Sequence, residues 1–292
     1  MKSLTDSVII ICGIVRNAAK GLKQNIPVIN ALCDNAKDYR IVIYENDSQD
    51  KTKEILIKWA DSRDTEKIHI LLNDGIIQEN TIPASNRTVN PFFSRSRIEK
   101  MVFFRNQYMK YVEKQNWNVD YMIVVDLDVE KMDLQGILTS FSTQEEWDAI
   151  TAFGYSTSPK LRLRYHDTYA LTENGYEDIP QTELSIFTNS KKYARLKNQK
   201  CLHAVFSAFG GLAIYRFDAI KDCYYEVLPN NDKRVEVRCE HFSLYKQMKK
   251  NGFEKVYINP KMILKYQRIT LNLILNTIKH KFNFFLNKNF SY

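Results

Sequence analysis

The feature that most constrains the fold is an apolar run near the N-terminus, SVIIICGIV, at residues 7–15. It is rich in β-branched residues and nearly free of polar ones, which is typical of a strand buried on both faces. Two further strands are predicted over 39–47 and 67–73, and helical periodicity over 20–38 and 48–63 separates the three. This β-α-β-α-β order implies right-handed crossovers, and therefore an α/β fold with a Rossmann-like, mainly parallel sheet flanked by helices.

The rest of the chain extends this pattern. Ser48 is a candidate N-cap for the second helix, and Gly252 is expected to end the last one. We expect one compact domain over 1–264, followed by a basic tail over 265–292. The remaining predictions are strands at 121–126, 147–155, 205–216 and 253–264, helices at 96–115, 134–146 and 239–252, a loop at 74–95 and an irregular segment at 156–200.

Composition excludes several classes of protein. The chain is 44% hydrophobic, 12% aromatic and 26% charged, which argues for a soluble globular protein and against disorder. Its five cysteines are scattered and form no CxxC pair, which favours a reduced, cytoplasmic setting over a disulfide framework or a zinc site. No signal peptide and no transmembrane segment is predicted.

The formal net charge of +8 suits an anionic ligand, an anionic membrane surface or nucleic acid. From Lys255 to the C-terminus there are seven lysines and arginines but no acidic residue, so much of the excess charge lies in the tail. Since no nucleic-acid recognition motif accompanies this charge, nucleic acid is not expected as a partner.

Three carboxylates follow the fourth predicted strand, in the sequence YMIVVDLDVE at 121–130. Ligands of open α/β sheets bind beyond the carboxyl ends of the strands, which is where Asp126 and Asp128 lie. Side chains at positions i and i+2 of an extended segment point the same way, so both carboxylates can converge on one Mg²⁺ or Mn²⁺. The alternative is a solvated strand end whose acids cap a helix.

Two other strand ends carry candidate ligand-binding groups. Glu45 ends the second strand, where an acid can accept hydrogen bonds from a nucleobase or a ribose. Asp47, Ser48 and Asp50, which follow it, are better interpreted as a helix N-terminus. Arg16 follows the first strand, where a guanidinium can pair with a diphosphate or simply face solvent.

Together these segments resemble GT-A glycosyltransferases, and within them the group of the fungal capsular α-mannosyltransferases and the Golgi mannan-polymerase subunits. The resemblance covers roughly residues 7–260, and we place no counterpart for the tail. A nucleotide-binding half over about 1–130 and an acceptor half over about 131–264 are implied. The carrying segments are SVIIICGIVRN, IYENDSQDKT, FFRNQYM, YMIVVDLDVE with its DxD, YHDTYAL, SAFGGLAIYR and CEHFSLYKQM.

The resemblance implies a metal-dependent transfer of a hexose from a nucleotide-diphosphate sugar, GDP- or UDP-linked. Arg16 and Glu45 are carried over as nucleotide contacts. Asp126 and Asp128 match the DxD, in which the second aspartate usually binds Mn²⁺ or Mg²⁺ and the first reaches the ribose or the metal. His241 is the candidate for a further metal ligand.

The later segments supply candidates for the sugar and the chemistry. Arg105 matches an arginine that contacts the donor or fixes the loop, and His166 and Asp167 lie in a block that approaches the donor sugar. Glu240 is the candidate base if the enzyme inverts, and Asp167, which is also expected to bind sugar hydroxyls, is the second catalytic candidate. Because neighbouring helix residues point about 100° apart, we do not expect Glu240 and His241 to serve one site.

The acceptor is expected to be a hydroxyl of a glycan or of a lipid-linked molecule, in the synthesis of a capsule or another cell-surface polysaccharide. The sequence does not decide between retention and inversion, and the resemblance leans toward retention. Rival interpretations are a nucleotidyltransferase of similar fold and a non-catalytic relative that binds a sugar nucleotide. The segment 269–292 has apolar residues at helical spacing beside lysines, so it is a candidate for peripheral binding to the anionic cytoplasmic leaflet.

Overall fold

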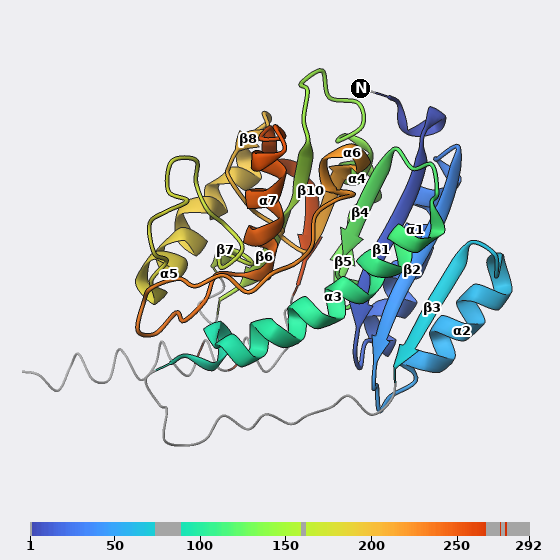
Figure 1. The fold of residues 1–292 in the computed structure, drawn as a ribbon, viewed down its shortest axis with the longest axis horizontal. Coiled ribbons are helices and arrows are strands. Elements are labelled where there is room, and N and C mark those ends of the chain that lie inside the picture. Colours follow the sequence, from blue (N-terminus) through green and yellow to red (C-terminus); the bar gives the residue numbers. More distant parts are fainter. Residues whose placement is uncertain (1, 74–88, 159–161, 267–274, 276–277, 279–292) are drawn as a thin grey trace, which may run out of the picture.

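The computed structural model describes residues 2–73, 89–158 and 162–266, together with Leu275 and Ile278. One ten-stranded sheet runs through the described chain in the order β3-β2-β1-β4-β9-β6-β10-β5, and β7 and β8 pair with β6 and β10 (Figure 1). The strands are β1 Val8–Val15, β2 Asp38–Asn46, β3 Ile68–Asn73, β4 Tyr121–Val125, β5 Lys131–Met132, β6 Ala149–Thr157, β7 Leu163–Tyr165, β8 His203–Ala204, β9 Leu212–Arg216 and β10 Val256–Lys265.

The long strands share one direction with a single exception. Strands β1 to β4 are mutually parallel, and β6 is parallel to β10. Strand β9 lies antiparallel between β4 and β6 and joins the two parallel sets. The predicted α/β class with a mainly parallel central sheet is therefore confirmed.

Helices cover both faces of this sheet. Alternate residues of β1 show the division, because Ile9 and Ile11 pack in one hydrophobic core and Ile10 and Cys12 in the other. Helices α1, α2 and α4 bury their apolar sides in the first core, and α3 and α7 in the second. The helices are α1 Ala19–Asp34, α2 Thr52–Arg63, α3 Arg95–Gln115, α4 Leu134–Leu138, α5 Glu183–Lys192, α6 Phe217–Ile220 and α7 Glu240–Lys250, with 3-10 turns at Leu4–Asp6, Pro91–Phe93 and Tyr193–Asn198.

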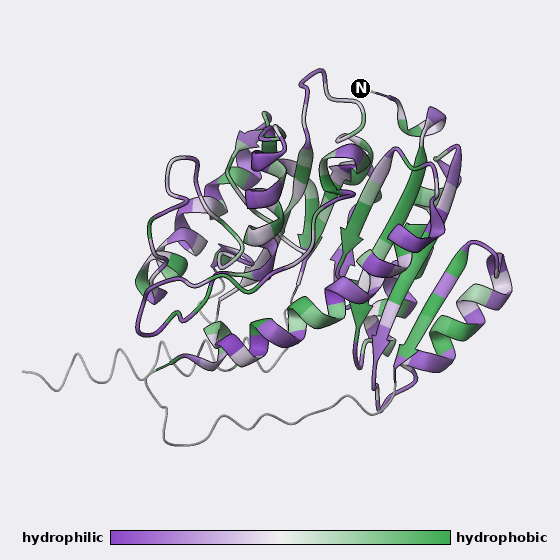
Figure 2. Ribbon diagram, in the orientation of Figure 1, coloured by the Kyte–Doolittle hydropathy of each residue, from purple (hydrophilic) through white to green (hydrophobic). Residues whose placement is uncertain are grey.

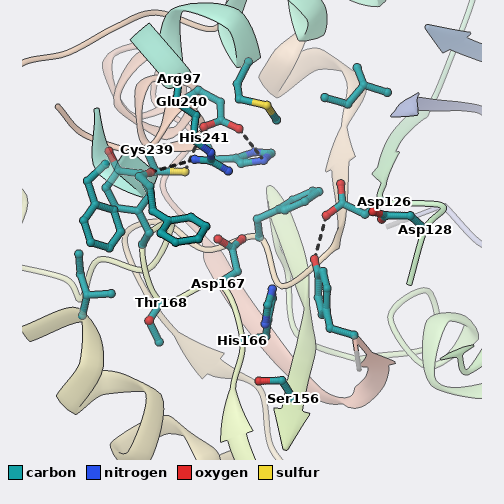
Figure 3. Close-up of a pocket in the computed structure, with 18 of the residues that line it drawn as sticks. Arg97, Asp126, Asp128, Ser156, His166, Asp167, Thr168, Cys239, Glu240 and His241 are labelled. Atoms are coloured by element: carbon teal, nitrogen blue, oxygen red, sulfur yellow. Dashed lines mark hydrogen bonds and ion pairs between the residues drawn. The ribbon is translucent and has the colours of Figure 1, made fainter. Parts of the chain in front are cut away.

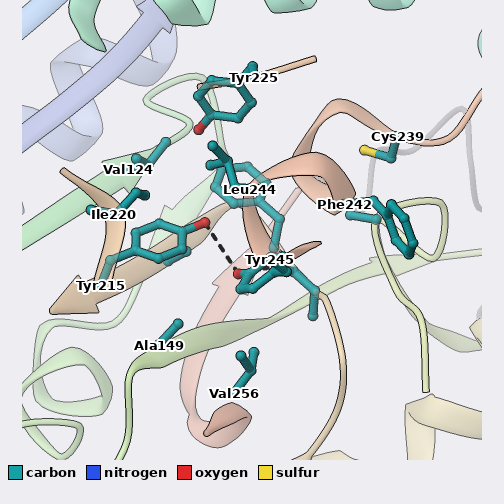
Figure 4. Packing of buried hydrophobic residues seen from close by; sticks show 14 of the residues in the cluster. Val124, Ala149, Tyr215, Ile220, Tyr225, Cys239, Phe242, Leu244, Tyr245 and Val256 are labelled. Carbon is teal, nitrogen blue, oxygen red and sulfur yellow. Dashed lines mark hydrogen bonds between the residues drawn. The ribbon is translucent and has the colours of Figure 1, made fainter. Parts of the chain in front are cut away.

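Hydropathy explains this layering. The central strands are the most apolar part of the chain, whereas the helices alternate between apolar and polar residues (Figure 2). Helix α7 illustrates the packing: Leu244 and Tyr245 enter the core, and the hydroxyl of Tyr245 lies 3.2 Å from that of Tyr215 on β9 (Figure 4). This buried contact fixes α7 against the middle of the sheet.

The structure corrects several predicted elements. Helix α2 begins at Thr52, and the hydroxyl of Ser48 accepts a hydrogen bond from the backbone N–H of Asn17 at 2.9 Å, so Ser48 does not cap α2. The helix predicted over 134–146 ends at Leu138. The segment predicted to be irregular contains β7 and α5, and α5 begins with a capping box between Thr182 and Ser185.

Other boundaries agree or lie outside the described residues. Gly252 follows α7 with a φ of +87°, as expected for a helix-ending glycine. The strand predicted over 205–216 begins only at Leu212, after the Gly210–Gly211 pair. Most of the predicted loop 74–95 and nearly all of the tail over 269–292 lie outside the described residues. Among the described residues, no helix is long and apolar enough to cross a bilayer.

Candidate active site

The carboxylates of interest lie on the segment that follows β4. The backbone N–H of Asp126 donates to the carbonyl of Gly211 at 2.8 Å, which ties this segment to the start of β9. Helix α1 holds it from the other side, because the side-chain amide of Asn25 donates to the carbonyls of Leu127 and Val129 at 3.0 and 2.7 Å. Leu127 is fully buried, so the two aspartates are held on the outer side of an anchored turn.

Gly21 makes this approach of α1 feasible. A Cβ at position 21 would lie 2.5 Å from the Cα of Asp128 and 2.6 Å from the carbonyl oxygen of Leu127. Real Cβ atoms do not come so close to backbone, so only glycine lets the first turn of α1 pack on the carboxylate segment.

A cavity of about 1080 Å³ opens beside these carboxylates. Asp126 and Asp128 lie at one side of it, Glu240 and His241 at the other, and Asp167 between them (Figure 3). Of the site residues predicted from the sequence, the cavity is lined by Arg16, Arg105, Asp126, Asp128, His166, Asp167, Glu240 and His241.

Some neighbours of Asp126 raise the pKa of its carboxyl group and others lower it. Its side chain is only 22% exposed, and this burial raises its pKa to about 6, with a further upward contribution from Asp128. The guanidinium of Arg105, 3.7 Å away, and the hydroxyl of Tyr266, which donates to Asp126 Oδ2 at 2.8 Å, favour the ionised form. The carboxylate is therefore charged above about pH 6.

Arg105 links the two sides of the cavity. It is 3% exposed, and its Nε donates to Glu240 Oε1 at 3.1 Å. Its guanidinium also lies 5.1 Å from the centre of the Phe209 ring. One of its nitrogens, Nη1, has no hydrogen-bond partner, so a buried N–H donor set remains for a bound anion.

Glu240 and His241 line the same cavity, which contradicts the expectation that helical spacing would separate them. The reason is their position: they are the first two residues of α7, whose N-terminus faces the cavity, so both side chains reach it (Figure 3). Burial opposes ionisation of Glu240, but the positive charge of Arg105 and a backbone hydrogen bond lower its pKa. Burial and Arg105 lower the pKa of His241, so its imidazole is neutral.

His166 and Asp167 approach the carboxylates from the segment after β7. The ring of His166 stacks on that of Tyr266 with centroids 3.6 Å apart, and burial lowers the pKa of His166 to about 4. Asp167 has a left-handed backbone, with φ of +61°. Burial, reinforced by the charges of Asp126 and Glu240, raises the pKa of Asp167 to about 8, so its carboxyl is mostly protonated at neutral pH.

The two predicted nucleotide contacts differ in placement. Arg16 is exposed and lies at the cavity wall. Glu45 is fully buried and does not line the cavity: its Oε1 accepts a hydrogen bond from the backbone N–H of Ser48 at 2.6 Å. Glu45 therefore stabilises the turn after β2 in this structure, and a contact with nucleotide stays a prediction.

The predicted metal ligands are only partly assembled. Among the described residues, no group of three His, Cys, Asp or Glu side chains is arranged to hold a metal ion. Asp126 and Asp128 line one cavity, and two carboxylates completed by substrate phosphates are a donor set that suits Mg²⁺ or Mn²⁺. Both nitrogens of His241 lack hydrogen-bond partners, but its ring stacks on Phe209, with centroids 3.9 Å apart. The carboxylate pair thus fits a metal, whereas the structure does not bring His241 to it.

Three residues of the site escaped prediction. Tyr266 reaches Asp126 from the end of β10, and Asn25 and Gly21 support the carboxylate segment from α1. These roles arise only from contacts between residues that are distant in the sequence. Tyr266 is 140 residues from Asp126, and Asn25 is 102 residues from Leu127. The small residue at 21 within a predicted helix was the one local signal of a close approach.

Comparison with known families identifies the chain. Residues 10–251 match the model of the family described as Cryptococcal mannosyltransferase 1. The chain belongs to this family. The match includes the carboxylate segment, the antiparallel β9 and the whole of α7, so it covers both sides of the cavity. The predictions of a glycosyltransferase family and of a GT-A-type α/β fold are confirmed.

None of the curated proteins matches this chain. Among solved structures it is similar to the mannosyltransferase PcManGT from Pyrobaculum calidifontis in complex with GDP-Man and Mn²⁺, with 10% identity, a TM-score of 0.49, and coverage of 92% of this chain and 59% of that one. It is also similar to TarS of S. aureus, with 13% identity, a TM-score of 0.47, and coverage of 89% and 60%. The chain spans about three fifths of the length of these solved proteins.

Proposed function

We propose that this protein transfers a hexose from a nucleoside-diphosphate sugar to a hydroxyl of a glycan or lipid-linked acceptor, with a divalent metal ion. The observation that carries the proposal is the placement of Asp126 and Asp128. They follow a buried central strand and open into a large cavity, in a chain of a mannosyltransferase family. This family membership favours the transferase over the rival nucleotidyltransferase.

Asp126 and Asp128 would hold the metal, which is Mn²⁺ or Mg²⁺ in this proposal. When bound, the metal offsets the negative charge of the departing diphosphate. Arg16 at the cavity wall and the unpartnered Nη1 of Arg105 supply further positive charge for the same diphosphate. Placed in a partly enclosed cavity, these cations act more strongly than they would in water.

His166 and Asp167 are proposed to bind the sugar. Asp167, protonated at neutral pH, is able to donate a hydrogen bond to a sugar hydroxyl and to accept others. The donor in this proposal is a GDP- or UDP-linked hexose.

The acceptor hydroxyl must lose a proton during attack on the anomeric carbon. If the configuration inverts, a carboxylate accepts this proton, and Glu240 remains the candidate base, because Asp167 is mostly protonated at neutral pH. Arg105 donates a hydrogen bond to Glu240 and favours its ionised form, whereas Asp167, with a pKa of about 8, becomes available as a base only as the pH rises through 8. If the configuration is retained, the leaving phosphate accepts the proton on the same face.

Donor binding tests this proposal. Calorimetric titration of the full chain with GDP-mannose, UDP-glucose, UDP-galactose and UDP-GlcNAc, each with and without Mn²⁺, is expected to give metal-dependent binding of one donor. Asp128→Ala should weaken that binding by about tenfold or more, since it removes a charged ligand of the metal. Binding of no donor under either condition would contradict the proposal.

A further inference from the structure

A second, smaller cavity lies on the other side of helix α5. Its volume is about 230 Å³, and Thr172, Glu173, Gln181, Asn189, Lys192 and Arg238 contribute to its lining. Ile186, Phe187 and Ser190 of the same helix line the large cavity. The helix therefore separates the two spaces, and a ligand in the smaller one would not touch the carboxylate segment.

Arg238 is the unusual group in this second cavity. Its side chain is 5% exposed, and its guanidinium packs over the Phe242 ring, 4.8 Å from the centre. Its Nη2 donates to the carbonyl of Glu177 at 2.8 Å and to that of Ile179, whereas Nη1 has no hydrogen-bond partner. No described carboxylate forms an ion pair with Arg238. A buried guanidinium with an unused nitrogen is costly unless an anion compensates it.

The charges around the cavity do not supply that anion. The carboxylate of Glu173 forms an ion pair with Lys192, and that of Glu177 is 3.2 Å from Lys249. Asp178 is the remaining acidic group whose charge acts on Arg238, but it makes no direct contact with the guanidinium. Among the residues that line the cavity, Lys192 and Arg238 are cationic and Glu173 is the one carboxylate, so the lining itself carries a net positive charge.

We propose that this second cavity binds a small oxyanion, a carboxylate or a phosphate, at Arg238, which lines it and has one nitrogen without a partner. A volume of about 230 Å³ admits a single acidic sugar or a sugar phosphate but is below the usual size for larger ligands such as a nucleotide sugar. Tyr176 and Ile179, both 53% exposed, also line the cavity, and their ring and alkyl group can cover the apolar face of such a ligand.

The test compares three full-length proteins by calorimetric titration with inorganic phosphate, glucuronate and neutral mannose. Wild type is expected to bind phosphate or glucuronate saturably but not mannose, and the tighter anion identifies the class. Asn189→Asp places a carboxylate in the cavity without altering Arg238, and like-charge repulsion should weaken binding by about tenfold or more. Thr188→Asp makes the same charge change on the exposed side of α5 and should leave the affinity unchanged.

Phosphate can also enter the large cavity, and the variants separate the two sites. Equal anion affinity in wild type and Asn189→Asp would overturn the proposal, as would the absence of anion binding to wild type. Metal-dependent donor binding is expected to be the same in all three proteins, so a failure of the proposed transferase function would be seen independently. Arg238→Gln is less informative, because Nη2 also holds two backbone carbonyls.

Discussion

At the scale of single residues, the ionisation of Asp126 determines the pH range in which the site can hold a metal. Burial raises its pKa to about 6, and Arg105 and Tyr266 limit that rise. Only the ionised carboxylate binds a divalent cation, so metal affinity should increase through pH 6 and level off above pH 7.

Tyr266→Phe tests this balance. Removing the hydroxyl takes away a hydrogen bond that favours the charged form, so the pKa of Asp126 should rise by about one unit. Mn²⁺ affinity, followed by electron paramagnetic resonance, is then expected to fall about fivefold at pH 6 and hardly at pH 8. Tyr257→Phe, on strand β10, which ends one residue before Tyr266, is the matched control. An equal loss at both pH values would mean that Tyr266 acts through packing alone.

The sequence revealed those site residues whose signal is local. Asp126 and Asp128 stand directly after an apolar run, and that position is visible without a structure. Tyr266 and Arg238 carry no such signal, because each acquires its role from a contact with a distant part of the chain. The 100° rotation between neighbouring helix residues predicts that Glu240 and His241 face different sites. That prediction fails here because both residues lie in the first turn of α7, at the helix end that faces the cavity.

At the scale of elements, helix α1 is the support of the carboxylate segment. The two hydrogen bonds from Asn25 satisfy carbonyls that would otherwise be buried without partners, and Gly21 lets the helix come close enough to make them. Helix α1 therefore contributes to the proposed metal site although it provides no ligand.

Asn25→Ala should reveal this contribution. With two buried carbonyls left unpaired, the free energy of unfolding is expected to fall by about 2 kcal/mol. Mn²⁺ affinity should fall as well, because the carboxylate segment loses its anchor. Gln24→Ala, at an exposed position of the same helix, should change neither quantity. A loss of stability with unchanged metal affinity would refute the link between α1 and the site.

The elements that the sequence predicted well are those whose pattern is decided by burial. Strands β1 and β4 are apolar throughout and β2 has an apolar centre over 41–44, whereas α1, α3 and α7 show a helical period. Helix α5 was missed because it buries little, with Leu184 and Phe187 remaining 76% and 61% exposed. Helix α4 is short, and Gly136 at its middle lies against the backbone of Lys261, where a Cβ would not fit.

At the scale of the whole molecule, the question is where the protein finds its acceptor. The basic tail favours an anionic membrane surface, and peripheral attachment to the cytoplasmic leaflet stays a prediction. Two tail residues within the described part, Leu275 and Ile278, are 52% and 58% exposed.

Removal of residues 269–292 is expected to release the protein from liposomes that contain anionic lipids, as measured by co-sedimentation. The physical reason is the joint loss of apolar side chains and lysines, each lysine contributing about 1 kcal/mol near such a surface. Full-length protein on neutral liposomes provides the control. If the shortened protein sediments as before, the membrane contact lies elsewhere or does not exist.

The central claim is that Asp126 and Asp128 make this protein a metal-dependent hexosyltransferase. The most direct measurement is the turnover of the donor that binds best, with Mn²⁺ and with chelator, by wild type, Asp128→Asn and Asp218→Asn. Asp218 is an exposed carboxylate on α6, and its substitution is a matched control. We predict Mn²⁺-dependent turnover that Asp128→Asn reduces at least a hundredfold and Asp218→Asn leaves intact. Turnover that survives both chelator and Asp128→Asn would contradict the account.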